Sequence, residues 1–133
     1  MNVIFLCGPS HSGKTTTINM VYNDLLNSQA TIITNYQHIA KGSKQDFFAV
    51  VNYCNKKIAF FSMGDYKNYV EFAIAFFIGQ NCDVLICALN RRFKKPLTNR
   101  YLYQFTNTVV KKSVGTNHST LNRKDAKAII SNI

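Results

Sequence analysis

The sequence lacks any apolar run long enough to cross a membrane. Its longest candidate, residues 72–78, is far shorter than the roughly 18 residues of a spanning helix. A basic leader is also missing, and the first apolar run leads directly into a glycine-rich loop, which indicates a core strand and not a signal peptide. With no repeat and no low-complexity segment, residues 1–133 are expected to form one domain around a single core.

Cysteine patterns typical of disulfide frameworks and zinc sites are also absent. None of the four cysteines, Cys7, Cys54, Cys82 and Cys87, belongs to a Cys-x-x-Cys pair. Because only three scattered histidines accompany them, a structural metal site is not expected. We therefore expect buried free thiols in a protein of the cytoplasm, where thiols stay reduced.

Acidic residues are scarce. Six Asp and Glu stand against 16 Lys and Arg, which gives a net charge of +10. Residues 71–133 contain ten basic and three acidic residues and therefore carry +7 of this charge. Such an imbalance favours polyanionic partners, among them nucleotides, nucleic acid and acidic lipid, without choosing among them.

What the chain does have is a glycine-rich loop between an apolar strand and an amphipathic helix. Five apolar residues precede Gly8-x-x-x-x-Gly13-Lys14-Thr15. Gly8 allows a sharp turn, and Gly13 allows bare backbone to approach an anion. Successive N–H groups between them can form an anion nest, to which the following helix adds its positive end. Lys14 supplies a mobile charge for outer phosphates, and the Thr15 hydroxyl suits one position on Mg²⁺.

This stretch resembles the Walker A motif of P-loop NTPases, with strand, loop and helix in the order that the motif requires. The resemblance is specific over residues 3–17 and implies a Mg²⁺-dependent site for a nucleoside triphosphate. It assigns the following residues to phosphate binding: Gly8, Pro9, Ser10, His11, Ser12, Gly13, Lys14, Thr15 and Thr16.

Hydrophobic spacing predicts the remaining elements. The helix at 66–78 is apolar all round in its later part and is expected to be well buried, and Asn122 is expected to cap the last helix. The strand at 108–114 is expected to be partly exposed, because two lysines interrupt it. Strands are expected at 3–7, 31–34, 47–53, 58–62, 83–89 and 108–114, helices at 14–27, 66–78, 97–107 and 122–133, and loops at 35–46 and 90–96.

This order predicts an α/β fold. We expect a three-layer α/β/α sandwich around a mostly parallel sheet, with ligands at the carboxyl ends of the strands. The hairpin at 47–62 suggests one antiparallel edge strand, as the smaller GTPases have. The predicted architecture is therefore similar to that of P-loop NTPases of the kinase and GTPase division.

Asp65 is the predicted acidic partner of the loop. It follows the strand at 58–62, whereas Asp83 starts its strand and should lie at the opposite end of the sheet. The segment resembles the Asp-x-x-Gly region of Ras-like GTPases, but aligning Gly64 with the family glycine puts Phe61 where the family has its aspartate. Asp65 then falls where the family has a water-orienting glutamine. Asp65 therefore either holds Mg²⁺ together with Thr15 or assists the attacking water or hydroxyl.

The resemblance gives little support for guanine recognition. The GTPase family reads guanine with Asn-Lys-x-Asp after a later strand, and the nearest match here, at residues 90–93, has no aspartate. A second near match at residues 122–125 opens a predicted helix, where capping explains it. ATP is therefore the expected nucleotide, and GTP is less favoured.

The basic segment after the strand at 83–89 has three open interpretations. Arg91, Arg92 or Arg100 can stabilise charge during phosphoryl transfer, as a basic lid does in P-loop kinases. The same residues can form a nucleic-acid surface or an ordinary solvated surface. The first hypothesis for function is ATP hydrolysis, with Lys14, Asp65, Arg91 and Arg92 as catalytic candidates. The alternatives are a small-molecule or nucleotide kinase and a nucleotide-dependent nucleic-acid-binding module.

Overall fold

The computed structural model describes residues 1–39, 45–100 and 105–133, without the side chains of residues 98–100. The described elements are β1 (Asn2–Gly8), α1 (Lys14–Asn27), β2 (Thr31–His38), β3 (Phe47–Tyr53), β4 (Lys56–Phe61), α2 (Lys67–Gly79), β5 (Val84–Asn90), the 3₁₀ helix η1 (Arg91–Phe93), α3 (Lys94–Arg100), β6 (Thr106–Lys111) and α4 (His118–Ile130). The strands form one sheet in the order β2-β3-β4-β5-β1-β6.

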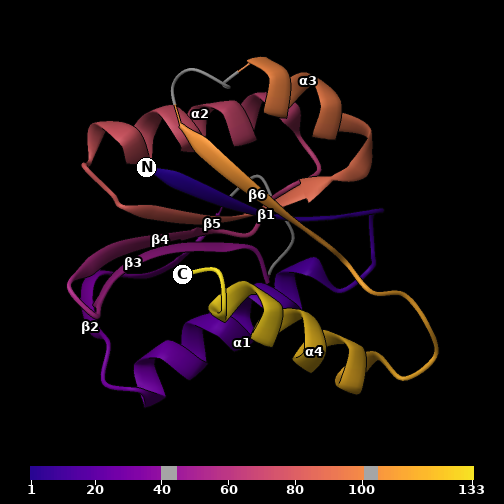
Figure 1. Cartoon of the computed structure of the whole chain (residues 1–133), viewed down its shortest axis with the longest axis horizontal. Coiled ribbons are helices and arrows are strands. Elements are labelled where there is room, and N and C mark those ends of the chain that lie inside the picture. Colours follow the sequence, from indigo (N-terminus) through magenta and orange to yellow (C-terminus); the bar gives the residue numbers. More distant parts are fainter. Residues whose placement is uncertain (40–44, 101–104) are drawn as a thin grey trace.

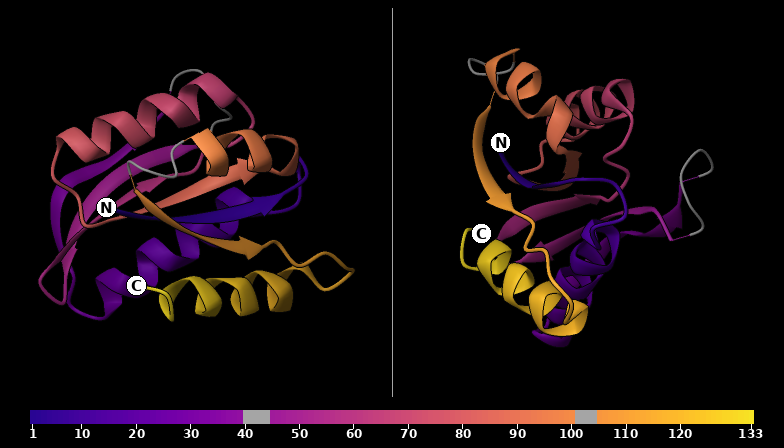
Figure 2. Two further views of the ribbon diagram at one scale, coloured as in Figure 1. Left: turned by 45° about the horizontal axis from the view of Figure 1, so that its top comes forward. Right: turned by 90° about the vertical axis from the view of Figure 1, so that its right-hand side faces the viewer.

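Helices cover both faces of this sheet. Helices α2 and α3 lie on one face, and α1 and α4 lie on the other (Figure 1, Figure 2). Side chains of β1 alternate between two buried clusters, with Phe5 on the α2 side and Ile4 and Leu6 on the α1 side. A parallel strand covered on both faces is apolar along its whole length, as β1 is. The predicted three-layer α/β arrangement is confirmed.

The sheet is mostly parallel, but its antiparallel strand is not at the edge. Strands β4, β5, β1 and β6 are parallel neighbours, whereas β3 runs antiparallel to both β2 and β4. The predicted antiparallel edge strand is therefore wrong, because β3 lies second from the edge and β2 occupies the edge. Strand β2 continues to His38 and so includes the first four residues of the predicted 35–46 loop. Residues 40–44 of that loop lie outside the described residues.

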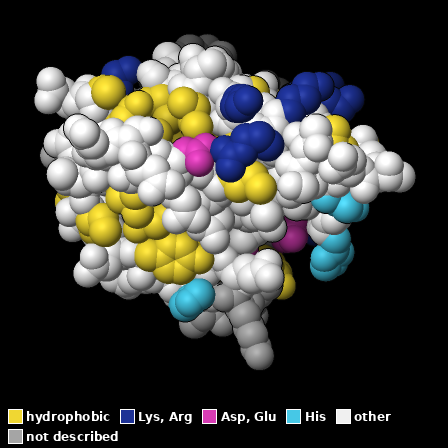
Figure 3. Space-filling view, turned by 90° about the horizontal axis from the view of Figure 1, so that it is seen from below, with side chains coloured by type: hydrophobic (Ala, Val, Ile, Leu, Met, Phe, Trp, Pro, Cys, Tyr) yellow, Lys and Arg dark blue, Asp and Glu magenta, His cyan; other side chains and the backbone are white. Residues whose placement is uncertain are grey.

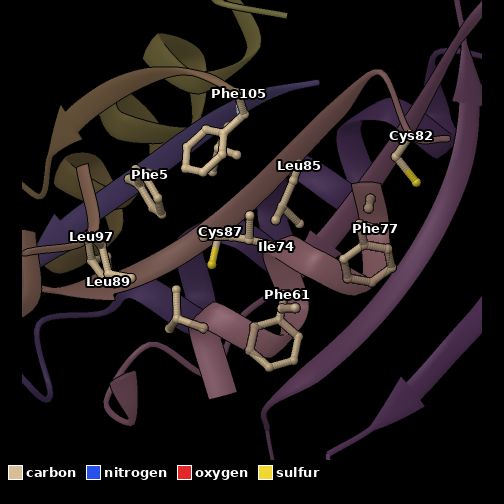
Figure 4. Packing of buried hydrophobic residues seen from close by; sticks show 14 of the residues in the cluster. Phe5, Phe61, Ile74, Phe77, Cys82, Leu85, Cys87, Leu89, Leu97 and Phe105 are labelled. Atoms are coloured by element: carbon tan, nitrogen blue, oxygen red, sulfur yellow. The ribbon is translucent and has the colours of Figure 1, made fainter. Parts of the chain in front are cut away.

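The core on the α2 side shows why helix α2 is not buried all round. Val70, Ala73, Ile74 and Phe77 point to the sheet (Figure 4 labels Ile74 and Phe77). Because only one stripe of a helix can face the sheet, Phe72 is 64% exposed and Phe76 is 45% exposed. The predicted burial of the later part of this helix is wrong. The exposed rings instead line an apolar groove of about 620 Å³.

The segment after β5 differs from the prediction. Residues 91–100 form η1 and α3, where a loop was expected at 90–96, and β6 begins at Thr106 inside the predicted 97–107 helix. Leu97 and Phe105 are buried against the sheet (Figure 4), while residues 101–104 lie outside the described residues. Strand β6 is partly exposed, as predicted, but Lys112 just after it is only 2% exposed, because its ammonium pairs with Asp125 at 3.0 Å.

The N-cap of the last helix lies five residues before the predicted one. The side-chain oxygen of Asn117 accepts the N–H of Thr120 at 3.2 Å, so Asn117 is the N-cap. Asn122 consequently lies within α4, where it is buried. None of the helices in the described ranges combines the length and apolar character that a membrane crossing requires.

The cysteines are free, as predicted, but they are not all buried. Cys7, Cys82 and Cys87 are buried, whereas Cys54 is exposed. Cys54 and Asn55 form the two-residue turn between β3 and β4, with φ angles of 52° and 60°. Such left-handed turns join hairpin strands because their twist matches that of the sheet. The prediction of buried thiols is therefore wrong for Cys54.

Candidate functional site

Most of the predicted site residues lie around one cavity at the carboxyl end of the parallel strands, whereas Gly8, Pro9 and Arg91 are not among its lining residues. Strand β1 runs from the N-terminus toward the right of Figure 1 and there turns into α1 through residues 8–15, here called the glycine loop. The cavity beside this loop has a volume of about 630 Å³. Its lining residues are Ser10, His11, Ser12, Gly13, Lys14, Thr15, Thr16, Gln45, Asp46, Ser62, Met63, Gly64, Asp65, Tyr66 and Arg92.

The two glycines of the glycine loop are required by space and conformation. A Cβ on Gly8 would lie 2.7 Å from Cβ of Lys112 and 3.0 Å from Oγ of Ser12, so no side chain fits there. Gly13 has φ of +91° and forms the N-cap of α1, a conformation that costs an L-residue about 1–2 kcal/mol. The loop is therefore tightly packed from behind and exposes backbone to the cavity.

The first turn of α1 offers N–H groups to the cavity. No side chain caps this helix, and its first turn contains no acidic residue. The first N–H groups of a helix have no partner within the helix and carry part of its positive macrodipole. In combination with the loop, this end of α1 favours an anion.

Lys14 places a positive charge over the same loop. Its Nζ donates hydrogen bonds to the carbonyl oxygens of Gly8 at 3.2 Å and Pro9 at 2.6 Å, and it lies 3.9 Å from Oδ1 of Asp65. Burial lowers the pKa of Lys14, and the carboxylate of Asp65 opposes that shift. The structure thus brings together Lys14 and Asp65, which are 51 residues apart in the chain.

Asp65 reaches the glycine loop although its strand is not adjacent to β1. Strand β5 lies between β4 and β1, and the chain crosses the end of β5 at Gly64, where a Cβ would lie 2.5 Å from the carbonyl carbon of Ala88. The carbonyl of Gly64 accepts the N–H of Asn90 at 2.9 Å. Only a residue without a side chain allows this crossing, which carries Asp65 to the cavity.

Asn90 connects Asp65 with the start of the glycine loop. Its side-chain Nδ2 donates to Oδ1 of Asp65 and to Oγ of Ser10, each at 3.1 Å. The Ser10 hydroxyl also donates to Oδ1 of Asp65 at 3.2 Å. In the sequence, Asn90 is notable only as part of a near match to the guanine motif. Its position at the end of a buried strand is the signal that points to the site.

Asp46 is the site residue that sequence reasoning missed. Its Oδ1 accepts hydrogen bonds from the hydroxyls of Thr15 at 2.8 Å and Ser62 at 3.1 Å, and the residue is 8% exposed. Asp46 precedes β3, and because β3 is antiparallel, its first residues lie at the edge where β1 and β4 end. The polar segment around Asp46 carries no local pattern that reveals this placement.

The arginine candidates are not equivalent. Arg92 lines the cavity, and its Nη2 lies 3.5 Å from the carbonyl oxygen of Asp65, while its guanidinium lies 4.8 Å from the ring centroid of Phe93. Arg91 is exposed and is not among the lining residues. The side chain of Arg100 is outside the described part of the chain.

Basic side chains also gather on the face formed by α1 and α4 (Figure 3). Helix α4 contributes Arg123, Lys124 and Lys127 to a groove of about 600 Å³ beside Met20 of α1. Arg123 forms an ion pair with Asp24. Part of the positive charge of the second half therefore lies away from the cavity.

The oxygen atoms near Thr15 are the donors that suit a hard cation. In the described ranges there is no group of three or more His, Cys, Asp or Glu side chains arranged for a metal ion. A threonine hydroxyl and a carboxylate nevertheless match the preference of Mg²⁺, which usually takes one or two protein oxygens and otherwise water and phosphate oxygens. No protein-family model matches this sequence, no curated protein matches it, and no solved structure matches its fold.

Proposed function

We propose that this protein is a Mg²⁺-dependent P-loop nucleotide-binding protein that hydrolyses ATP. The observation that carries the proposal is the convergence of Lys14, the uncapped start of α1 and the Thr15–Asp46 pair on one cavity of about 630 Å³. A triphosphate needs a cradle of donors, a positive charge and oxygen ligands for its metal, and all three lie around this cavity.

Each residue of this convergence has a role in the proposed reaction. The N–H groups of the glycine loop and of the first turn of α1 bind the inner phosphates, and the ammonium of Lys14 binds the outer ones. The Thr15 hydroxyl would hold Mg²⁺, which when bound would supply positive charge to neutralise the charge that develops on the transferred phosphoryl group. Arg92 stands at the rim, where a guanidinium can stabilise the same charge.

The surroundings of Asn90 support ATP over GTP. Its amide donates to Ser10 and Asp65 at the phosphate end of the cavity, so it is occupied within the site and does not read a base. The sequence near it has no aspartate of the kind that the GTPase motif uses to bind guanine. ATP, or a nucleotide of any base, is therefore the proposed ligand.

The test is a thermal-shift panel of ATP and GTP with Mg²⁺ on the wild type, Lys14→Ala and Lys67→Ala. Lys67 is the matched control because it is a lysine on the surface of α2, 3.6 Å from Glu71. At 100 times the Kd, a ligand stabilises the native state by about 2.7 kcal/mol, so ATP should raise the Tm of the wild type and Lys67→Ala by several degrees. Lys14→Ala should show little or no shift.

Phosphate release in the same samples tests the reaction. Inorganic phosphate should accumulate with the wild type and Lys67→Ala and not with Lys14→Ala. Transfer of labelled phosphate to an added acceptor above the water background would identify a kinase instead. A wild type that shifts with none of the nucleotides, or a Lys14→Ala variant that shifts as the wild type does, would overturn the proposal.

A further inference from the structure

The two carboxylates of the cavity have different surroundings. Asp46 is 8% exposed and receives the hydroxyls of Thr15 and Ser62. The side chain of Asp65 is 45% exposed, and its carboxylate contacts Ser10, Lys14 and Asn90. Asp46 therefore lies at the Thr15 end of the glycine loop, and Asp65 lies at the Ser10 end.

We propose that Asp46, and not Asp65, is the carboxylate that holds Mg²⁺ together with Thr15. This inference rests on the proposed function. It assigns metal binding to Asp46 and leaves the second role considered for Asp65, the orientation of the attacking water, to Asp65. Asp65 then acts at the Ser10 end of the glycine loop, where its hydrogen bonds with Ser10 and Asn90 position it to orient the attacking water.

The hydrogen-bond directions at Asp46 support this assignment. Oγ of Ser62 accepts the N–H of Phe47 at 2.9 Å, so its own proton points to Oδ1 of Asp46 at 3.1 Å. The proton of the Thr15 hydroxyl points to the same Oδ1 at 2.8 Å. An ionised carboxylate only accepts hydrogen bonds. With its proton directed at Asp46, the Thr15 oxygen presents lone pairs to any third group, which is the orientation that a cation requires.

The backbone keeps Asp46 in this position. The carbonyl of Asp46 accepts the N–H of Ile39 at 3.0 Å, and the carbonyl of Phe47 accepts the N–H of Ser62 at 3.0 Å. These bonds tie the start of β3 to the ends of β2 and β4 on either side. Carboxylates that are hydrogen-bonded on several sides are preorganised for metal binding, because their orientation costs nothing further when the ion binds.

The residue at the family position explains why another acid is needed. In the alignment of Gly64 with the glycine of Ras-like GTPases, Phe61 takes the place of the metal-side aspartate. Phe61 is 7% exposed and packs in the apolar cluster under α2 (Figure 4). It therefore offers no oxygen to the cavity, and Asp46 supplies the carboxylate from the neighbouring strand.

The experiment measures Mn²⁺ binding by electron paramagnetic resonance in the presence of a non-hydrolysable ATP analogue. Asp46→Asn and Asp65→Asn are compared with the wild type and with Asp24→Asn, a control that changes a surface aspartate paired with Arg123. Asp46→Asn should weaken Mn²⁺ binding by at least about 10–100-fold, because the loss of a group that only orients metal ligands already costs that much. Asp65→Asn and Asp24→Asn should stay within about 2-fold of the wild type.

A second measurement separates this inference from the proposed function. Binding of a fluorescent ATP analogue with EDTA reports nucleotide affinity without metal. If the wild type binds the analogue neither with EDTA nor with Mn²⁺, the proposed function fails. If it binds the analogue but Asp65→Asn loses Mn²⁺ affinity as much as Asp46→Asn or more, only the present inference fails. The Asp65→Asn result decides even where Asp46→Asn does not fold, because the exposed Asp65 side chain can be replaced without disturbing the core.

Discussion

The side-chain oxygen of Asn122 lies 2.9 Å from the point that a Cβ atom on Gly13 would occupy. Helix α4 thus packs directly behind the glycine loop, with Asn122 6% exposed. This oxygen is buried and has no hydrogen-bond partner in the described ranges. One side of the glycine loop therefore faces the cavity, and the other side packs against α4. Gly13 is constrained by both its φ angle and the side chain of Asn122.

Replacing Gly13 with alanine should destabilise the protein by about 2–4 kcal/mol, because left-handed backbone strain adds to overpacking against Asn122. It should also remove the Mg²⁺-ATP thermal shift. Gly79→Ala is the matched control, since no atom lies within 4 Å of its Cβ position. That variant should lose no stability and gain up to about 1 kcal/mol. Urea unfolding measures both, and equal stabilities would contradict the packing described here.

Asp125 gives stability that depends on pH. Burial alone would raise its pKa, but the hydrogen bonds from the hydroxyl and N–H of Ser113 and the ion pair with Lys112 hold the pKa below its ordinary value. The folded state then keeps Asp125 ionised at pH values where the unfolded chain binds a proton. The free energy of unfolding therefore decreases as the pH is lowered through that window. The contribution should be complete above about pH 4, the ordinary carboxyl value, and should be lost as pH falls below it.

Asp125→Asn should therefore cost about 3–5 kcal/mol near neutral pH, because it leaves the buried charge of Lys112 without its partner. Asp24→Asn breaks a partly exposed pair near the surface and should cost no more than about 1 kcal/mol. Urea unfolding at pH 7, 5, 4 and 2.5 gives the difference between each variant and the wild type. A deficit for Asp125→Asn that stays constant from pH 5 to pH 2.5 would refute the assigned role.

Two phenylalanines of α2 should respond differently to the same substitution. Phe77 is 2% exposed and packs in the core, whereas Phe72 is 64% exposed. Phe77→Ala should destabilise the protein by about 3–5 kcal/mol, and Phe72→Ala by less than about 1 kcal/mol. Comparable losses in urea unfolding would show that Phe72 is covered in solution.

The four thiols should differ in their reaction with Ellman's reagent. Cys54 is exposed, whereas Cys7, Cys82 and Cys87 are buried, and burial raises the pKa of each of these three. Because the thiolate is the reactive form, one equivalent should react rapidly at pH 8 and the other three only on unfolding. Cys54→Ser should abolish the rapid phase. A second rapid equivalent in the native wild type would contradict the burial of the remaining three.

The sequence predicts the segment from β1 to α1 well because its determinants are local. Apolar residues, turn glycines and helical spacing follow one another directly, and α1 spans Lys14 to Asn27 as predicted. The hairpin and β5 are also recognisable, because their apolar runs are bounded by polar turns. The proximity of Lys14 and Asp65 could also be expected, because parallel strands end at the same side of a sheet.

The rest depends on contacts between distant residues. The place of Asp46 follows from the direction of β3, which no local pattern encodes, and the place of β5 between β1 and β4 depends on the whole sheet. Asn117 and Asn122 both suit the start of α4, and only the bond from Thr120 to Asn117 selects between them. The burial of Lys112 requires Asp125 from another element, so a strand pattern alone predicts exposure.

The position of β1 between β5 and β6 has a consequence for how the protein folds during synthesis. Its two neighbours are β5 and β6, which the ribosome synthesises only after residue 83, so the first strand to emerge waits for most of the chain before it can pair. Contacts between such distant segments slow folding, because a long stretch of chain must close first. A nascent chain that stops after α2 contains every glycine of the loop but no neighbouring strand to hold it in place.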